Sequence, residues 1–154
     1  MFRVSDNHQR RHRKISNFLA TDPEIAVILG VIEFEWTVRR AILAMGKSPT
    51  KEINDRFEKE KIGGLSALNE CWKKEVKPRT KNGLCEYLQK DLPQIKKAIA
   101  LRNKIVHGMQ GKASGNYAAN SVTSLIKASK DIAALTENMD SSVYRNIPRR
   151  IKSR

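Results

Sequence analysis

Apolar residues recur at intervals of three and four through most of this chain, and that spacing limits its fold more than any other feature. The spacing lines one side of an α-helix, whereas a half-buried strand alternates every second residue. The clearest run follows Thr21-Asp22-Pro23-Glu24, where a capping side chain, a proline and an acid predict a helix start. Its apolar members are Ile25, Ile28, Leu29, Ile32, Trp36, Ile42 and Leu43, and Gly46 ends it.

The same spacing predicts further helices along the chain. A short charged helix is expected over 50–61 and another over 65–76, while the basic stretch 77–83 is predicted to be a loop. A new helix starts at Asp91-Leu92-Pro93 and runs to Gly108, and Asn116 is expected to cap a last long helix. No alternating strand pattern is present in the sequence. The expected fold is all-α, an up-and-down bundle of four to five helices.

Positive charge dominates the composition and gathers at the two ends. The chain has 154 residues with 30 Lys and Arg against 16 Asp and Glu, a net charge of +14. We therefore expect a basic N-terminal extension over 1–20, a helical domain over 21–140 and a basic C-terminal tail over 141–154, with both ends outside the core. Such a charge favours a polyanionic partner, with nucleic acid first and an anionic membrane surface second.

Several classes of site are missing from the sequence. Two cysteines, Cys71 and Cys85, are too few for a disulfide framework or a structural zinc site, and they are expected to be small buried residues. His8 and His12 are four residues apart with no third metal ligand, and no phosphate-cradling glycine loop is found. No membrane span and no apolar signal segment is visible. We expect a cytoplasmic protein without metal or cofactor.

One segment carries residues suited to phosphate chemistry, Ala100-Leu101-Arg102-Asn103-Lys104-Ile105-Val106-His107-Gly108. Arginine offers a permanent fork of donors to a phosphate, and histidine exchanges protons near neutral pH. Asn103 and His107 are four residues apart, so they are neighbours on a helix and the amide can orient the imidazole. The alternative interpretation is a helix end that carries a favourable cation and a solvated arginine.

Arg102-Asn103-x-x-x-His107 resembles the motif of ribonucleases in the HEPN superfamily, all-α domains that carry Arg, four to six residues and then His. The motif also precedes one last long helix here, as in that family. Glu35-x-x-x-Arg39 in the first long helix is similar to an acidic–basic pair that accompanies the motif in several nuclease branches. Arg3 and His8 repeat the spacing by chance. Met109 stands where several toxin branches paired with nucleotidyltransferases have tyrosine.

The resemblance implies a metal-independent endoribonuclease in which the RNA 2′-hydroxyl attacks the adjacent phosphate. His107 then transfers protons, Arg102 stabilises charge on the phosphoryl oxygens, and Asn103 orients His107 or holds the phosphate. It also implies a homodimer with a composite active site, a toxin or a defence or stress effector, and an antitoxin as a further partner. The other hypothesis is a non-catalytic basic helical module that binds nucleic acid or an acidic protein. A helix-turn-helix repressor fits poorly, because residues 84–106 lack the small-residue turn.

Overall fold

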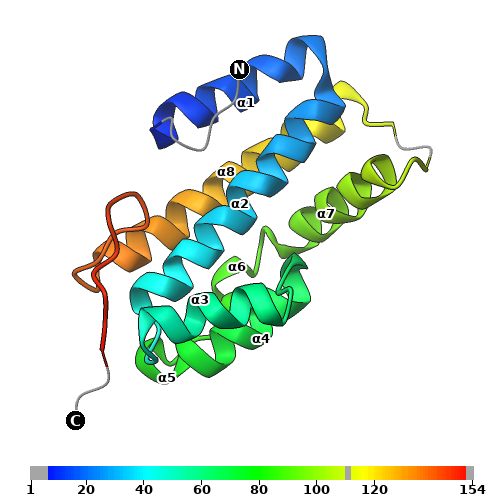
Figure 1. Cartoon of the computed structure of the whole chain (residues 1–154). Coiled ribbons are helices and arrows are strands. Elements are labelled where there is room, and N and C mark those ends of the chain that lie inside the picture. Colours follow the sequence, from blue (N-terminus) through cyan, green and yellow to red (C-terminus); the bar gives the residue numbers. More distant parts are fainter. Residues whose placement is uncertain (1–6, 110–111, 152–154) are drawn as a thin grey trace. The chain divides into compact units, whose positions relative to one another are not determined.

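The computed structural model confirms an all-α protein. It describes residues 7–109 and 112–151, and within them it contains eight helices and no strand (Figure 1). The helices are α1 (His8–Thr21), α2 (Pro23–Met45), α3 (Thr50–Lys59), α4 (Gly64–Glu75), α5 (Lys77–Thr80), α6 (Leu84–Leu88), α7 (Leu92–Val106) and α8 (Gly115–Glu137). The predicted four to five helices are therefore too few, because α1 and the one-turn helices α5 and α6 were not expected.

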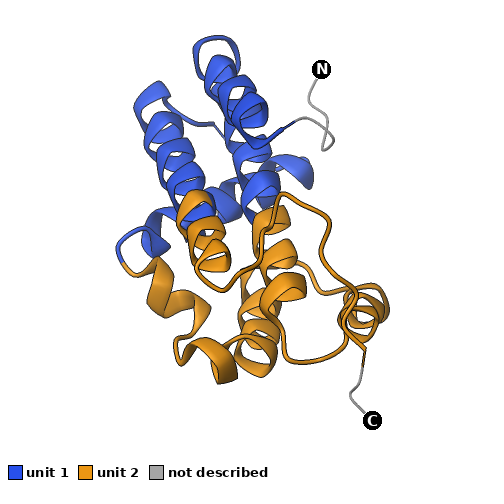
Figure 2. Ribbon diagram, turned by 90° about the vertical axis from the view of Figure 1, so that its left-hand side faces the viewer, with its two compact units in different colours: residues 1–34, 90–129 blue, residues 35–89, 130–154 orange. Residues whose placement is uncertain are grey.

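The chain divides into two compact units, coloured separately in Figure 2. Unit 1 comprises residues 1–34 and 90–129, and unit 2 comprises residues 35–89 and 130–154. The boundary falls inside the two longest helices, so α2 and α8 each contribute residues to both units.

Unit 1 is built from α1, α7 and the first parts of α2 and α8. Helices α2 and α8 approach closely at Gly30, where an added Cβ would lie 3.0 Å from the Leu125 side chain. The side chain of Gln94 on α7 donates to the Ser121 hydroxyl on α8 at 2.8 Å. Ile95 lies among the fully buried residues, so apolar packing and one polar contact join α7 to the unit.

The N-terminal region is part of unit 1. Residues expected to form an extension outside the core fold into α1, which begins after Asn7, whose side chain accepts the Arg10 backbone N–H at 2.8 Å. Ile15 is completely buried, and Arg11 is only 3% exposed. The expectation is thus wrong for residues 8–20, because one apolar anchor and a buried ion pair hold a mostly basic helix in place. Residues 1–6, including Arg3, lie outside the described part.

Unit 2 packs the short helices around Trp72. This side chain is fully buried, its Nε1 donates to the Asn82 carbonyl at 3.2 Å, and Tyr87 meets it edge-on at 6.1 Å between ring centroids. The predicted loop over 77–83 is wrong in part. Residues 77–80 form α5, which ends where Lys81 adopts a left-handed φ of 66°.

The C-terminal segment is also fastened to its unit. The Arg150 guanidinium donates to the Ala44 carbonyl at 2.9 Å and to the Ser48 carbonyl at 3.1 Å, and Arg79 donates to the Met45 carbonyl at 2.9 Å. Ala44 and Met45 belong to the last turn of α2, where carbonyls lack helical partners and attract cations. Val143 is fully buried. A free tail over 141–154 was therefore the wrong expectation for its described residues.

Two helix starts show how side chains set the boundaries. Asp22 accepts the Ile25 backbone N–H at 3.3 Å, which confirms the predicted start of α2. At α8 the Ser114 hydroxyl accepts the Tyr117 backbone N–H at 3.2 Å, so Ser114 takes the capping place expected of Asn116. Asn116 lies inside the first turn instead.

Candidate functional site

The C-terminal end of α7 is fixed by a glycine turn. Gly108 has a φ of 69°, a left-handed conformation that glycine adopts without steric cost. The Gly108 N–H bonds to the Ile105 carbonyl at 3.1 Å, and the Met109 N–H bonds to the Lys104 carbonyl at 2.8 Å. This pair of bonds closes a helix end tightly. It places His107 as the last residue before the chain turns.

The three predicted catalytic residues lie together on this last part of α7. The His107 N–H bonds to the Asn103 carbonyl at 3.0 Å, so the two residues stack one turn apart, and both side chains are exposed. Within the described part of the chain, neither side chain makes a hydrogen bond or ion pair, so the expected orientation of His107 by Asn103 is not present. Arg102 is half-buried, at the edge of the face that carries buried Ala98 and Leu101.

The surroundings of these residues are basic. Helix α7 carries Lys96, Lys97, Arg102 and Lys104 and no acid. A phosphate approaching its end meets no carboxylate on the same helix, and the exposed His107 is open to the proton exchange that such a substrate needs. The geometry offers donors and an imidazole on one accessible helix end.

The supporting pair Glu35 and Arg39 belongs to unit 2. Arg39 donates through Nη2 to the Ile62 carbonyl, and its guanidinium carbon lies 5.4 Å from the centroid of the Phe57 ring. These contacts attach α3, which carries Phe57, and the residues that follow it to α2. Arg39 therefore has a structural role within its unit, and Glu35, four residues earlier on α2, is half-buried.

Unit 1 contains a buried ion cluster that was not predicted from the sequence. It is formed by Arg11, His12 and Glu33 and is called here the Glu33 cluster. Arg11 Nε donates to Glu33 Oε2 at 2.7 Å and Arg11 Nη2 donates to Oε1 at 3.0 Å, while His12 Nε2 lies 3.2 Å from Oε1. Burial raises the pKa of the Glu33 carboxyl, but hydrogen bonds from His12 and Arg11 outweigh it and leave that pKa below its usual value.

Unit 2 contains a comparable group, the Glu75 cluster of Ser48, Arg56 and Glu75. The Ser48 backbone N–H and hydroxyl each donate to the Glu75 carboxylate at 2.9 Å, and Arg56 Nη2 pairs with the same group. Burial raises the pKa of Glu75, and the bonds from Arg56 and Ser48 lower it below the usual value. For Glu33 the signal in the sequence is a carboxylate within the apolar first half of α2, whereas Glu75 ends a helix that is already rich in polar residues and gives no such signal.

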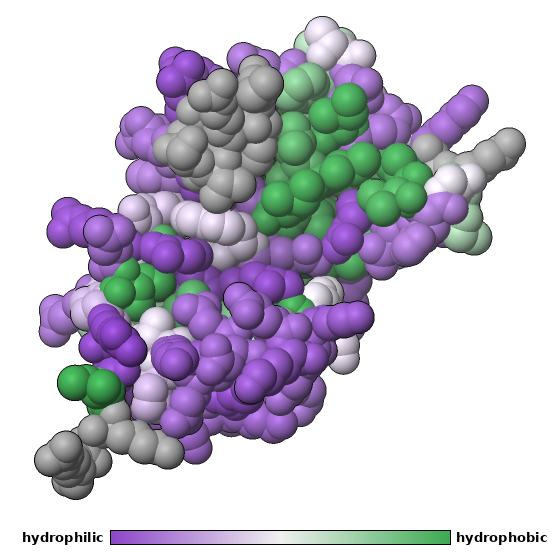
Figure 3. Space-filling view, viewed as in Figure 1, coloured by the Kyte–Doolittle hydropathy of each residue, from purple (hydrophilic) through white to green (hydrophobic). Residues whose placement is uncertain are grey.

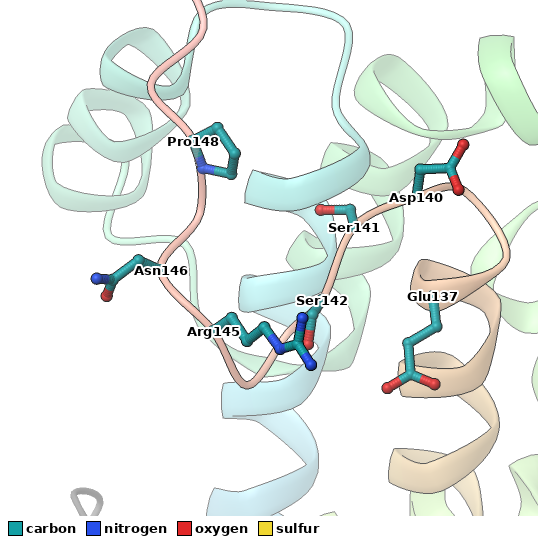
Figure 4. Close-up of a pocket in the computed structure, with 7 residues that line it drawn as sticks. All are labelled: Glu137, Asp140, Ser141, Ser142, Arg145, Asn146 and Pro148. Carbon is teal, nitrogen blue, oxygen red and sulfur yellow. The ribbon is translucent and has the colours of Figure 1, made fainter.

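A polar cleft of about 540 Å³ lies where the chain turns back after α8 (Figure 4). Glu137, Asp140 and Ser141 line it from the end of α8 and the turn, and Arg145 and Pro148 line it from the returning segment. Asp140 adopts a φ of 56° in that turn. None of the sequence-predicted site residues lines this cleft.

The described residues contain no group of three His, Cys, Asp or Glu that could hold a metal ion. Both cysteines are free, and burial raises the pKa of the Cys71 thiol, which disfavours a nucleophilic thiolate. Among the described helices, none has the length and apolar character needed to cross a membrane.

No protein-family model, curated protein or solved structure matches this chain. The resemblance to the HEPN superfamily rests on Arg102, Asn103 and His107 and on the order of the helices.

Proposed function

We propose that this protein is a metal-independent endoribonuclease of the HEPN type. The observation that carries the proposal is the end of α7, where Arg102, Asn103 and His107 occupy one helix end that Gly108 closes. In the reaction, the RNA 2′-hydroxyl loses its proton and attacks the adjacent phosphorus. The bond from phosphorus to the 5′-oxygen breaks, and the products carry a 2′,3′-cyclic phosphate and a 5′-hydroxyl.

His107 serves this reaction as a proton-transfer group, because its imidazole is exposed and can meet a bound phosphate. Arg102 balances the negative charge that grows on the phosphoryl oxygens. Asn103 becomes the orienting group for His107, or a phosphate ligand, when RNA is bound. The proposed setting is the cytoplasm, with a role as a toxin or as a defence or stress effector held in check by an antitoxin.

A homodimer belongs to the proposal, because cleavage by internal attack gains from a base and an acid whereas each chain supplies one exposed His107. A two-fold axis near α7 would bring two copies of each group to a composite cleft. Mixing inactive His107→Ala chains with wild type tests this point. If both histidines are needed, the mixture should be less active than its fraction of wild-type chains predicts. An activity equal to that fraction would contradict the composite site.

The cleavage test uses purified protein and a defined RNA in EDTA. Wild type should cut, and the new 5′ ends should accept phosphate from a polynucleotide kinase without prior phosphatase treatment. His107→Ala should lower the rate by about 10²-fold or more, with the circular dichroism melt unchanged. The matched control is His8→Ala, since His8 ends the other Arg-x₄-His spacing and lies on α1. Equal losses from both variants would defeat the assignment of the site.

The second candidate function is a non-catalytic basic module for nucleic acid or an acidic protein. Helices α1 and α7 favour it, because each carries four Lys or Arg and no acid. Such a module binds RNA with a steep dependence on salt but leaves it intact. Binding in the EDTA assay without fragments would select this function over the nuclease.

A further inference from the structure

The outer face of α2 in unit 1 is apolar where a surface helix is normally polar. Ile25, Ile28, Leu29 and Ile32 share this face and are called here the α2 apolar stripe. Ile25 and Ile32 are 38% and 41% exposed, and Ile28 and Leu29 are half-buried. Figure 3 shows apolar surface over this part of α2 that continues towards α7.

The polar residue of this segment is on the inside. Glu33 is 2% exposed and faces Arg11 and His12 of α1, while Gly30 packs against Leu125 of α8. The inner face of α2 is therefore already occupied within the unit. Ile25, Ile28 and Ile32 lie on the other side of the helix, and Leu29, one turn before Glu33, lies at the border. Aliphatic side chains on an outer face with a charged residue on the inner face indicate that another molecule covers the stripe.

The neighbouring helices define what kind of molecule fits. Helices α1 and α7 of the same unit carry eight Lys and Arg and no acid, and all of these bases but the buried Arg11 are at least partly exposed. The described acids of this unit all have partners: Glu33 in its cluster, Asp91 with Lys127 at 2.9 Å, Glu24 with the Ala113 N–H at 3.1 Å and Asp22 with the Ile25 N–H at 3.3 Å. A ligand for this surface must be apolar in the middle and acidic at its edges.

We infer that the α2 apolar stripe is a docking surface for an acidic amphipathic helix of a partner protein. The stripe covers two helical turns at spacings of three, four and seven, which matches the spacing of apolar residues on such a helix. A second copy of this chain would present the same apolar stripe and the same basic helices, and not the acidic edges that complement this surface. The four stripe residues are aliphatic, without the aromatic anchors that interfacial membrane helices use. The inference does not depend on the proposed ribonuclease activity.

The test measures binding of a synthetic 18-residue helical peptide with a leucine stripe flanked by glutamates, by fluorescence anisotropy with the full chain. The glutamate peptide should bind, and binding should weaken as salt rises. Versions with glutamine and with lysine flanks should bind progressively less well. Equal binding of the lysine version would overturn the inference, because charge would then play no part.

Variants locate the surface. Ile25→Gln and Ile32→Gln should each weaken peptide binding by about tenfold, the effect of losing one buried aliphatic contact. The matched control is Ile151→Gln in unit 2, whose side chain is 83% exposed and which should change nothing. Circular dichroism checks that each variant folds, as expected for glutamine on an exposed helix face. Unchanged binding by both stripe variants would overturn the inference.

Two further experiments test whether a second copy of the chain or a lipid surface covers the stripe. Sedimentation velocity of the chain alone tests for self-association through the stripe. Any association of the wild type should persist in Ile32→Gln, because its loss in that variant would mean that the stripe binds a second copy of the chain. Vesicles containing phosphatidylserine should bind wild type and Ile32→Gln equally. A selective loss of vesicle binding in the variant would assign the stripe to lipid and overturn the protein-partner inference.

Discussion

Each compact unit buries one glutamate, and the two are held in different ways. In unit 1, Glu33 is 2% exposed and its partners Arg11 and His12 are 3% and 7% exposed. In unit 2, Glu75 is 1% exposed, but the side chain of its partner Arg56 is 30% exposed, and Ser48 supplies two of its hydrogen bonds. All three residues of the Glu33 cluster are thus buried, whereas the arginine of the Glu75 cluster is partly exposed to solvent.

Burial of the cationic partner therefore decides how much a buried carboxylate contributes to stability. Removing the charge of Glu33 takes away the carboxylate to which a buried guanidinium donates two hydrogen bonds. Removing the charge of Glu75 leaves an arginine that can turn outward. The Glu33 cluster attaches a whole helix, α1, to α2, while the Glu75 cluster orders the turn at Ser48 and holds α3 through Arg56.

The largest expected effect follows from Glu33→Gln. The substitution removes the buried carboxylate charge to which Arg11 donates two hydrogen bonds, which costs about 3–5 kcal/mol of unfolding free energy. Urea denaturation measures the loss, and hydrogen exchange should show faster exchange in α1 before other elements. Glu58→Gln on exposed α3 surface is the control and should change stability little. A loss under 1 kcal/mol would show that the cluster is not the attachment of α1.

A smaller effect is expected from Glu75→Gln. Arg56 can move to solvent and the amide oxygen still accepts one bond from Ser48, so the expected loss is about 1–3 kcal/mol. The same denaturation experiment measures it, with faster hydrogen exchange expected around residues 46–60. If Glu75→Gln proved more damaging than Glu33→Gln, the exposure of the cation would not be what separates the two units.

The smallest effect is a pH dependence shared by both clusters. Each carboxyl has a folded pKa below the usual 4.5, so each stabilises the protein above pH 4.5 and loses that contribution as pH falls through its folded pKa. The stability difference between wild type and either variant should therefore be full at pH 7 and shrink in acid. Denaturation curves at a series of pH values below 4.5 check this, and a difference that grew on acidification would contradict the lowered pKa values.

Local signals in the sequence were enough to predict α7 and its end. Gly108 follows a helical pattern directly, and the glycine conformation needed there depends only on neighbouring residues. The fully buried Trp72 lies in α4, close to the helix that apolar spacing predicts over 65–76. The spacing of Arg102, Asn103 and His107 put them on one helix end, but the distance between their side chains depends on rotamers that spacing does not fix.

Helix α1 was missed because its stability comes from elsewhere in the chain. Its sequence is rich in bases, which resembles a solvated tail, and its carboxylate partner lies 22 residues further on. The returning C-terminal segment was missed for the same reason, since Arg150 contacts carbonyls 102 and 106 residues away. The spacing of apolar residues predicts which face of a helix is buried, but it does not predict ion pairs between residues far apart in the sequence.

Those separations also set an order of events during synthesis. The Arg11–Glu33 pair closes a loop of 22 residues and can form while the chain is still being made, whereas the Arg150–Ala44 bond closes one of 106. The carbonyls at the end of α2 thus remain uncapped by Arg150 until residue 150 has left the ribosome. Unit 2 gains the Arg150 contacts only then, so a nascent chain truncated before that point would carry an attached α1 and an end of α2 that lacks these contacts.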